Sequence, residues 1–460
     1  MEEQTDQKWH EPVLVLDQWC IYRIPSKLRN VNEASFTPQL LSIGPFHHGN
    51  PSLRDMDSHK KIYYEKFCER SSKNKDELKT FIQQRQENIL RCYAGTIECG
   101  NIDFVDIILV DACFIIELFM TNSETENHEN YYILRSPWLR KAVQQDLILF
   151  ENQLPYYLLQ DLYDFAKPAF SSRDGLNGVR AEEQAHGDIA NGQKYCFPNC
   201  FSGPRVSTET NIVIEAPHVQ HHFLDLTCEF FKEFTKGKPI KEGVKPKHFT
   251  DLVRHFLCTD KVADGSCIST ETKNKYNVRK LKAAGVKFIP LREPFVIIKE
   301  EKVHKSNFKL ACFTAMDLKL TRFWATYEAE CVMRNVMALE QLMYPDRAYI
   351  CSYFLLMDQL VHTVEDVDLL IKDGVIVNLL GSNKAVEKLV TSLCVQIMED
   401  KSCYSKICTQ LNEHYEISYW NRKLATLKRV YFKDLWTGSS TVVGFVVFVF
   451  SIIGTIQSLS

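Results

Sequence analysis

The sequence lacks the short motifs that mark the common nucleotide-binding and hydrolytic enzymes. It has neither the G-x-G-x-x-G loop nor the G-x-x-x-x-G-K-[ST] loop, whose backbone amides hold phosphates. It also has no H-E-x-x-H zinc motif and no G-x-S-x-G nucleophile elbow. These absences exclude the common enzyme classes that depend on those motifs, and the sequence predicts no cofactor.

An excess of positive charge is missing too. The chain carries 55 Lys and Arg against 58 Asp and Glu, a formal net charge of -3. Nucleic-acid-binding domains present a basic surface, so this balance predicts no nucleic-acid partner. The lysines of residues 236–247 lie in a stretch rich in Gly and Pro, which favours a solvated loop. A contact with phosphate or anionic lipid is the alternative.

Signals for secretion are absent as well. Residues 1–10 are polar and have no apolar signal core, and no N-x-[ST] glycosylation acceptor with a non-proline middle residue occurs. The 16 cysteines are scattered rather than spaced as a disulfide framework, which is typical of reduced thiols in the cytosol. We therefore expect the body of the protein to face the cytosol.

The C-terminal segment has no charged residue from 435 to 460. Its apolar stretch just reaches the roughly 20 residues that a helix needs to cross a bilayer. Five basic residues precede it, which favours a cytosolic body by the positive-inside rule, and Tyr431 and Trp436 are placed as interfacial anchors. The pattern predicts one transmembrane helix at 437–458, so that the membrane itself is a partner of a tail-anchored, single-pass protein. A buried C-terminal strand or core helix is the alternative.

The body, residues 11–434, is predicted to be mainly α. Apolar residues recur at helical spacing, and residues 104–120 form an apolar run that contains three acids. Because each acid is costly inside a bilayer, this run predicts a buried core helix. Residues 286–291, 295–298 and 308–313 predict a small antiparallel β element. Residues 168–217 lose apolar periodicity and predict a flexible insertion.

Two groups of residues are candidates for metal binding or catalysis. Cys196, Cys200, His218 and His221 combine thiol and imidazole ligands that suit zinc, although the spacing is unspecific and the segment reads as a loop. His47, Asp111 and Glu151 form the second group, because acids in apolar stretches must be paired or have shifted pKa values. We hypothesise that these three side chains converge. The alternative is a turn and two core hydrogen-bonding acids.

Six blocks and the end of the chain resemble the plant-specific family called domain of unknown function 247. Small departures include Ala112, where the family usually has Gly, and Asp434-Leu435 before Trp436. The matching blocks are FTPQLLSIGPFHHG (36–49), LVDACFIIELF (109–119), LFENQLPYYL (149–158), LKAAGVKF (281–288), RNVMALEQ (334–341) and SYFLLMD (352–358), followed by YFKDLW (431–436).

The resemblance implies a single, mainly helical body that usually ends in one transmembrane segment. It implies no established enzymatic activity and no catalytic residues, and some relatives are linked to self-incompatibility, which suggests recognition or signalling. We therefore expect a non-enzymatic interaction protein with an unknown protein partner. An undiscovered hydrolase that uses His47, Asp111 and Glu151 is the alternative, and a metal-binding module is the third hypothesis.

Overall fold

The computed structural model describes most of the chain between residues 18 and 431, in several stretches. The described residues are 18–95, 97, 103–124, 128–129, 131–168, 222–235, 243–258, 273–291, 316–399, 401–431 and parts of 443–454. The predicted insertion beyond Pro168 and the predicted strands at 295–298 and 308–313 lie outside these residues.

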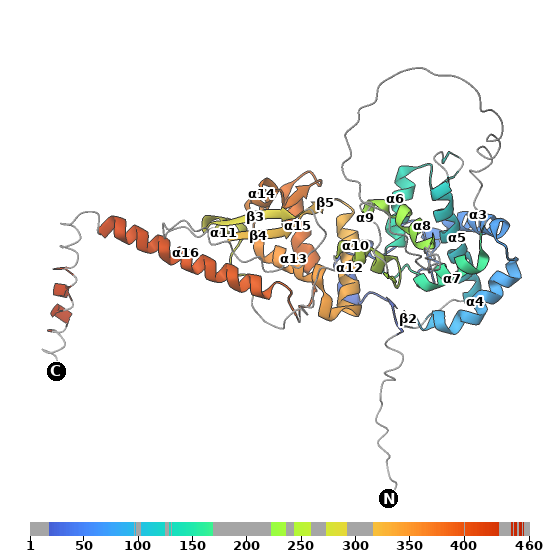
Figure 1. Cartoon of the computed structure of the whole chain (residues 1–460), viewed down its shortest axis with the longest axis horizontal. Coiled ribbons are helices and arrows are strands. Elements are labelled where there is room, and N and C mark those ends of the chain that lie inside the picture. The colour runs from blue at the N-terminus through green and yellow to red at the C-terminus, as the bar shows by residue number, and fades with distance from the viewer. Residues whose placement is uncertain are drawn as a thin grey trace, which may run out of the picture.

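The N-terminal half of the described chain is a helical layer around one central helix (Figure 1). That helix, α5 (Phe104–Glu124), buries every side chain from Asp111 to Asn122, which confirms the predicted core helix. Short helical pieces precede the layer at α2 (Ser26–Arg29), η1 (Glu33–Ser35) and η2 (Pro51–Leu53). The helices that pack on α5 are α3 (Arg54–Arg70), α4 (Lys75–Leu90), α7 (Tyr156–Ala166) and α8 (His222–Phe230). The other helices of this half are α6 (Pro137–Leu147) and α9 (Lys232–Thr235).

The C-terminal half combines helices with short strands, and α10 and α12 lie between the two halves (Figure 1). The last helix, α16, extends away from the body toward the C-terminus. Element bounds are α10 (Phe249–Leu257), α11 (Val278–Ala283), α12 (Ala329–Met343), η4 (Pro345–Arg347), α13 (Tyr349–Leu360), α14 (Val364–Lys372), α15 (Asn383–Cys394) and α16 (Ser405–Tyr431).

The described strands pair in parallel, so the predicted antiparallel β element is wrong. Strand β3 (Val286–Leu291), which matches its prediction, pairs with β4 (Met316–Thr321), and β5 (Phe323–Ala325) pairs with β6 (Ile376–Asn378). A third pair joins β1 (Ile21–Tyr22) to β2 (Tyr93–Ala94). Parallel strands need a long connection. Residues 292–315 between β3 and β4, and helices α12 to α14 between β5 and β6, provide that length.

The predicted transmembrane helix is also wrong. In the part of the chain that the structure describes, no helix has both the length and the apolar character that crossing a bilayer requires. The two longest described helices both contain charged residues that would be costly inside a bilayer. Helix α5 carries Asp106, Asp111, Glu117 and Glu124, and α16 carries Lys, Arg and Glu residues along its length.

One continuous apolar core joins the two halves. Its buried side chains run in sequence from Cys20 to Leu411. A smaller cluster packs Ile24 and Phe36 of the N-terminal segment against Phe150 and against Ala338 and Leu339 of α12. Burial of apolar surface is the main favourable term in folding, so these contacts hold the N-terminal segment against the middle of the molecule.

Glu117 of α5 gives the core a specific pH dependence. Burial raises the pKa of Glu117 to about 7, and Arg70, whose Nε lies 3.1 Å from the carboxylate, offsets this only in part. The usual value is 4.5, so between these pH values the folded chain keeps a proton that the unfolded chain has lost. Stability therefore falls as pH rises through this window, by about 3 kcal/mol in total.

We expect Glu117→Gln to flatten the pH dependence of the unfolding free energy in this window, because the variant cannot titrate there. Urea denaturation on either side of the window measures the slope. Glu124→Gln is the matched control, since it removes a different carboxylate from the same Arg70, 2.5 Å from its Nη1. Equal flattening in both variants, or in neither, would show that Glu117 is not the titrating group.

Candidate functional site

Residues 36–49 form an irregular loop with no helix or strand, and the side chain of Asp146 fixes its first part. One carboxylate oxygen of Asp146 accepts a hydrogen bond from the backbone N–H of Gln39 at 3.0 Å. The other accepts from Leu40 at 2.7 Å and Leu41 at 2.8 Å. Asp146 is buried and lies at the end of α6, so three backbone groups that would otherwise lack partners are satisfied by one side chain.

The run Glu151-Asn152-Gln153, in the turn that follows α6, makes further hydrogen bonds to the loop and to α10. Asn152 accepts from the N–H of Ile43 at 2.7 Å and donates to the carbonyl of Leu41 at 2.9 Å. Gln153 accepts from the N–H of Phe249 at 2.9 Å, which ties the same turn to α10. All three side chains of the run are buried. Buried side chains of the core thus form the hydrogen bonds that hold the loop.

Asp111 holds the middle of the loop through a buried ion pair. Its Oδ2 accepts from the N–H of Gly44 at 2.9 Å, and its Oδ1 lies 2.7 Å from Nζ of Lys60. Lys60 also donates to the carbonyl of Ser42 at 2.8 Å. Burial lowers the pKa of Lys60, but the Asp111 carboxylate outweighs burial, so the net pKa is raised and the lysine stays charged.

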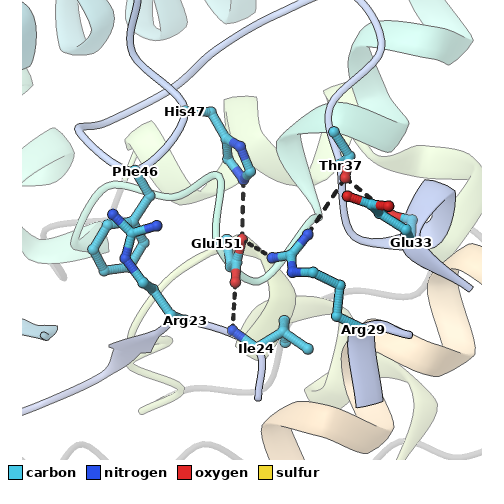
Figure 2. A pocket seen from close by; sticks show the side chains of 8 residues that line it. All are labelled: Arg23, Ile24, Arg29, Glu33, Thr37, Phe46, His47 and Glu151. Atoms are coloured by element: carbon cyan, nitrogen blue, oxygen red, sulfur yellow. Dashed lines mark hydrogen bonds and ion pairs between the residues drawn. The ribbon is translucent and has the colours of Figure 1, made fainter. Parts of the chain in front are cut away.

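Glu151 is the acid at the centre of a pocket, and three donors surround it (Figure 2). It accepts a hydrogen bond from the N–H of Ile24, forms an ion pair with Arg29, and has Nε2 of His47 at 3.2 Å. Burial raises the pKa of this carboxyl, but His47, Arg29 and the Ile24 amide together lower it below its usual value. Glu151 is therefore ionised at neutral pH, with both oxygens occupied.

The pocket has a volume of about 330 Å³ and is open to the surface through exposed residues of the N-terminal segment. The guanidinium of Arg23 lies over the ring of Phe46, 4.4 Å from its centroid. Arg29 reaches Oγ1 of Thr37 at 3.4 Å as well as Glu151. The lining residues are Arg23, Ile24, Arg29, Glu33, Thr37, Phe46, His47 and Glu151 (Figure 2).

The structure brings two of the three predicted acid and imidazole residues together. His47 and Glu151 meet in the pocket, whereas Asp111 is committed to Lys60 and Gly44 and is not part of the lining. The zinc candidates Cys196, Cys200, His218 and His221 lie outside the described residues. Among the residues that are described, no group of His, Cys, Asp and Glu is arranged to hold a metal ion.

Sequence reasoning missed the two arginines of the pocket. Arg23 and Arg29 lie in a short stretch without periodicity or motif, so nothing in the sequence pairs Arg23 with Phe46 or Arg29 with the distant Glu151. The one signal for them was indirect. A buried Glu151 needs a cation or an N–H group as its partner, but the sequence does not indicate which arginine or lysine that partner is.

Comparison with known proteins places the chain among plant proteins. The model of the family described as plant protein of unknown function, domain of unknown function 247, matches residues 21–450. The chain belongs to this family. It is 26% identical to UPF0481 protein At3g47200 of Arabidopsis thaliana, over 98% of this chain and 89% of that protein. It is 21% identical to Putative UPF0481 protein At3g02645 of Arabidopsis thaliana, over 90% of this chain and 85% of that protein. No solved structure matches the chain.

Four of the six sequence blocks that carried the family resemblance, 36–49, 109–119, 149–158 and 334–341, meet at this site. The loop 36–49, Asp111 and the run 151–153 are bonded to one another as described above. Asn335, from the block in α12, accepts from the N–H of Phe150 at 2.9 Å and donates to the carbonyl of Ser35 at 2.7 Å. Blocks far apart in the sequence of this family member therefore form one buried polar network.

We expect Asp111→Asn to destabilise the protein by roughly 3–5 kcal/mol, because the buried Lys60 charge loses its ionic partner. Asp57→Asn is the control. Asp57 lies 3.4 Å from the same Lys60 amine, but its side chain is 43% exposed, so the expected loss is under about 1 kcal/mol. Urea denaturation at neutral pH measures both. Similar losses in the two variants would contradict a buried Asp111–Lys60 pair.

Gly44→Ala is expected to cost roughly 3 kcal/mol. Gly44 has φ of +68°, and a Cβ atom there would lie 2.7 Å from the carbonyl oxygen of Gln153. Gly49→Ala is the matched control, since Gly49 also has positive φ, +78°, but has nothing within 4 Å of that position. Its expected cost is about 1 kcal/mol, for backbone strain alone. Thermal unfolding compares them, and equal losses would mean that the loop does not pack closely on the Gln153 turn.

Proposed function

We propose that this protein is a non-enzymatic recognition protein and that the pocket around Glu151 binds an acidic side chain of a partner protein. The observation that carries this proposal is the state of Arg23. Arg23 is exposed, and its guanidinium lies over the ring of Phe46. In the described part of the chain, no carboxylate forms an ion pair with Arg23. The pocket therefore presents one positioned cation that forms no ion pair within the described residues.

Besides Arg23, the pocket is lined by a second arginine, Arg29, and by two acids, the buried Glu151 and the exposed Glu33. Arg29 forms an ion pair with the buried carboxylate of Glu151, and Nε2 of His47 lies 3.2 Å from the same carboxylate. An incoming carboxylate bonded to Arg23 forms a charge-assisted pair, and guanidinium binds such a group in a planar, two-pronged geometry. Stacking on Phe46 holds the guanidinium in place before binding, which reduces the conformational entropy lost on association.

The size of the pocket supports a side chain as the occupant. Its volume of about 330 Å³ lies at the lower end of the roughly 300–1,000 Å³ typical of ligand pockets. The phenylalanine ring provides an apolar wall for the methylenes of an aspartate or glutamate, and the arginine at the surface meets its carboxylate. Interfaces are enriched in arginine and aromatic side chains of this kind.

A hydrolase is less well supported by the same geometry. A general base needs a pKa near the working pH and a free oxygen to take up a proton. The pKa of Glu151 is lowered and its oxygens already accept from Ile24, Arg29 and His47. Thr37 is the hydroxyl in the lining, and it donates to the carbonyl of Glu33 and accepts from Arg29. No described side chain in the pocket is thus positioned as an activated nucleophile.

The test is an array of short peptides with a fixed central residue and otherwise randomised positions. The central residue is Asp, Glu, phosphoserine, Ala or Lys, and the full-length protein is the probe. We expect stronger binding to acidic centres, and we expect Arg23→Ala to reduce it roughly tenfold or more, in line with the worth of a hydrogen bond to a charged group.

Arg85→Ala is the matched control for this array. Arg85 also stacks on a phenylalanine, with its guanidinium carbon 3.6 Å from the ring centroid of Phe81, but it does not line the pocket. Its variant should keep the wild-type preference. Equal binding to Ala and acidic centres, or equal loss in both arginine variants, would refute acidic recognition by this pocket.

A further inference from the structure

Cys20 and Cys92 face each other at the start of the first parallel strand pair. Strand β1 pairs with β2 in the register Ile21 to Tyr93, which makes the two cysteines the next opposed positions. The N–H groups of Cys20 and Ile21 both lie 2.9 Å from the carbonyl oxygen of Cys92. Adjacent strands lie roughly 4.8 Å apart, within the roughly 4.4–6.8 Å between Cα atoms that a disulfide requires. Both cysteines are free thiols in this structure.

A second pocket makes these thiols accessible to a small molecule. It has a volume of about 420 Å³ and shares no lining residue with the pocket around Glu151. Tyr157 of α7 and Lys247, just before α10, complete its polar side. Its lining residues are Gln18, Cys20, Asn88, Cys92, Tyr157, Pro246 and Lys247.

The surroundings of the two thiols differ in a way that gives them different roles. The Cys20 thiol hydrogen-bonds to Cys92 and, with the Tyr157 hydroxyl and the Lys247 charge, lowers the pKa of Cys92 in spite of its burial. The same hydrogen bond and burial raise the pKa of Cys20. A thiolate is the nucleophilic form of cysteine, so Cys92 attacks and Cys20 keeps its proton until the second step.

We propose that Cys20 and Cys92 are a thiol pair that hydrogen peroxide converts into a disulfide between β1 and β2. The Cys92 thiolate sulfur attacks one peroxide oxygen, the O–O bond breaks, and hydroxide leaves and takes up a proton from solvent as water. Cys92 is then a sulfenic acid. The Cys20 sulfur attacks the Cys92 sulfur, the S–O bond breaks, and the departing oxygen leaves with the Cys20 proton as a second water. Two thiols are oxidised, and the peroxide is reduced.

The consequence of this step is a covalent link between the N-terminal segment and the end of α4. Without it, β1 is held to β2 by a two-residue strand pair. The disulfide closes the chain from residue 20 to residue 92 into a ring and restricts the unfolded state. The oxidised protein is therefore expected to resist unfolding more than the reduced protein does.

The experiment treats the reduced full-length protein with hydrogen peroxide, alkylates the remaining thiols and maps the peptides by mass spectrometry without reduction. The expected result is a linked peptide that contains Cys20 and Cys92, formed before other cysteines are modified, and released by a reducing agent. Finding both residues alkylated while other cysteines are oxidised would overturn the proposal, and so would a linkage of either residue to a different cysteine.

Two variants separate the roles of the thiols. The Cys20→Ser variant lacks the thiol that would attack oxidised Cys92. Cys92 should therefore accumulate as a sulfenic acid, which a dimedone probe captures. Cys228→Ser is the control. Cys228 is more exposed than Cys92, yet burial raises its pKa to about 12, so the variant should form the Cys20–Cys92 link at the wild-type rate. Dimedone capture at Cys228 in preference to Cys92 would show that exposure alone governs the reaction.

Discussion

The structure depends on the hydrogen bonds that protein side chains provide to one irregular segment inside the core. Residues 36–49 have no helix or strand to satisfy their backbone groups, and a buried N–H without a partner costs several tenths to a few kcal/mol. Asp146, Asn152 and Asp111 supply the acceptors that water would otherwise supply. Because these side chains come from α5, α6 and the 151–153 turn, the backbone of the loop is fully hydrogen-bonded only when all three are in their native positions.

This constraint also decides what the acids are available for. In the sequence, Asp111 and Glu151 have the character of catalytic residues, since both are acids in apolar surroundings. In the structure, their oxygens are already bonded to the backbone and to Lys60, Arg29 and His47. What remains free at the surface of the network is a cation, Arg23. Because the oxygens of Asp111 and Glu151 are committed while the Arg23 guanidinium is available, the site favours binding over proton transfer.

Local features of the fold could be predicted from the sequence, whereas pairings between distant segments could not. The acids within residues 104–120 predicted a buried helix, and α5 is one. The pair Ser136-Pro137 is typical of a helix start, and the Ser136 side chain accepts from the N–H of Leu139 at the start of α6. Strand β5 was missed because its three residues, Phe323–Ala325, give too short a pattern to indicate a strand. The pairing direction of β3 was wrong because it depends on a distant partner.

The candidate site shows the same division. Glu151 stood out because of its apolar neighbours and His47 because it is one of two adjacent histidines in a turn, and the two side chains do meet. Asp111 stood out because of its apolar neighbours, but its partner Lys60 lies 51 residues earlier, on α3, in a helix whose pattern gave no reason to single out that lysine. The apolar tail predicted a transmembrane helix from length and composition alone. The described residues contain no such helix, so hydropathy over a marginal length was insufficient.

Native-state hydrogen exchange tests the central claim most directly. The amides of Leu41, Ile43 and Gly44 lie outside helices and strands but donate to buried side chains. We predict that they exchange only through global unfolding, as slowly as the amides in the middle of α5. Exchange at the rate of an ordinary surface loop would contradict the account, because it would show that the loop opens without the core and that its polar network does not hold the fold together.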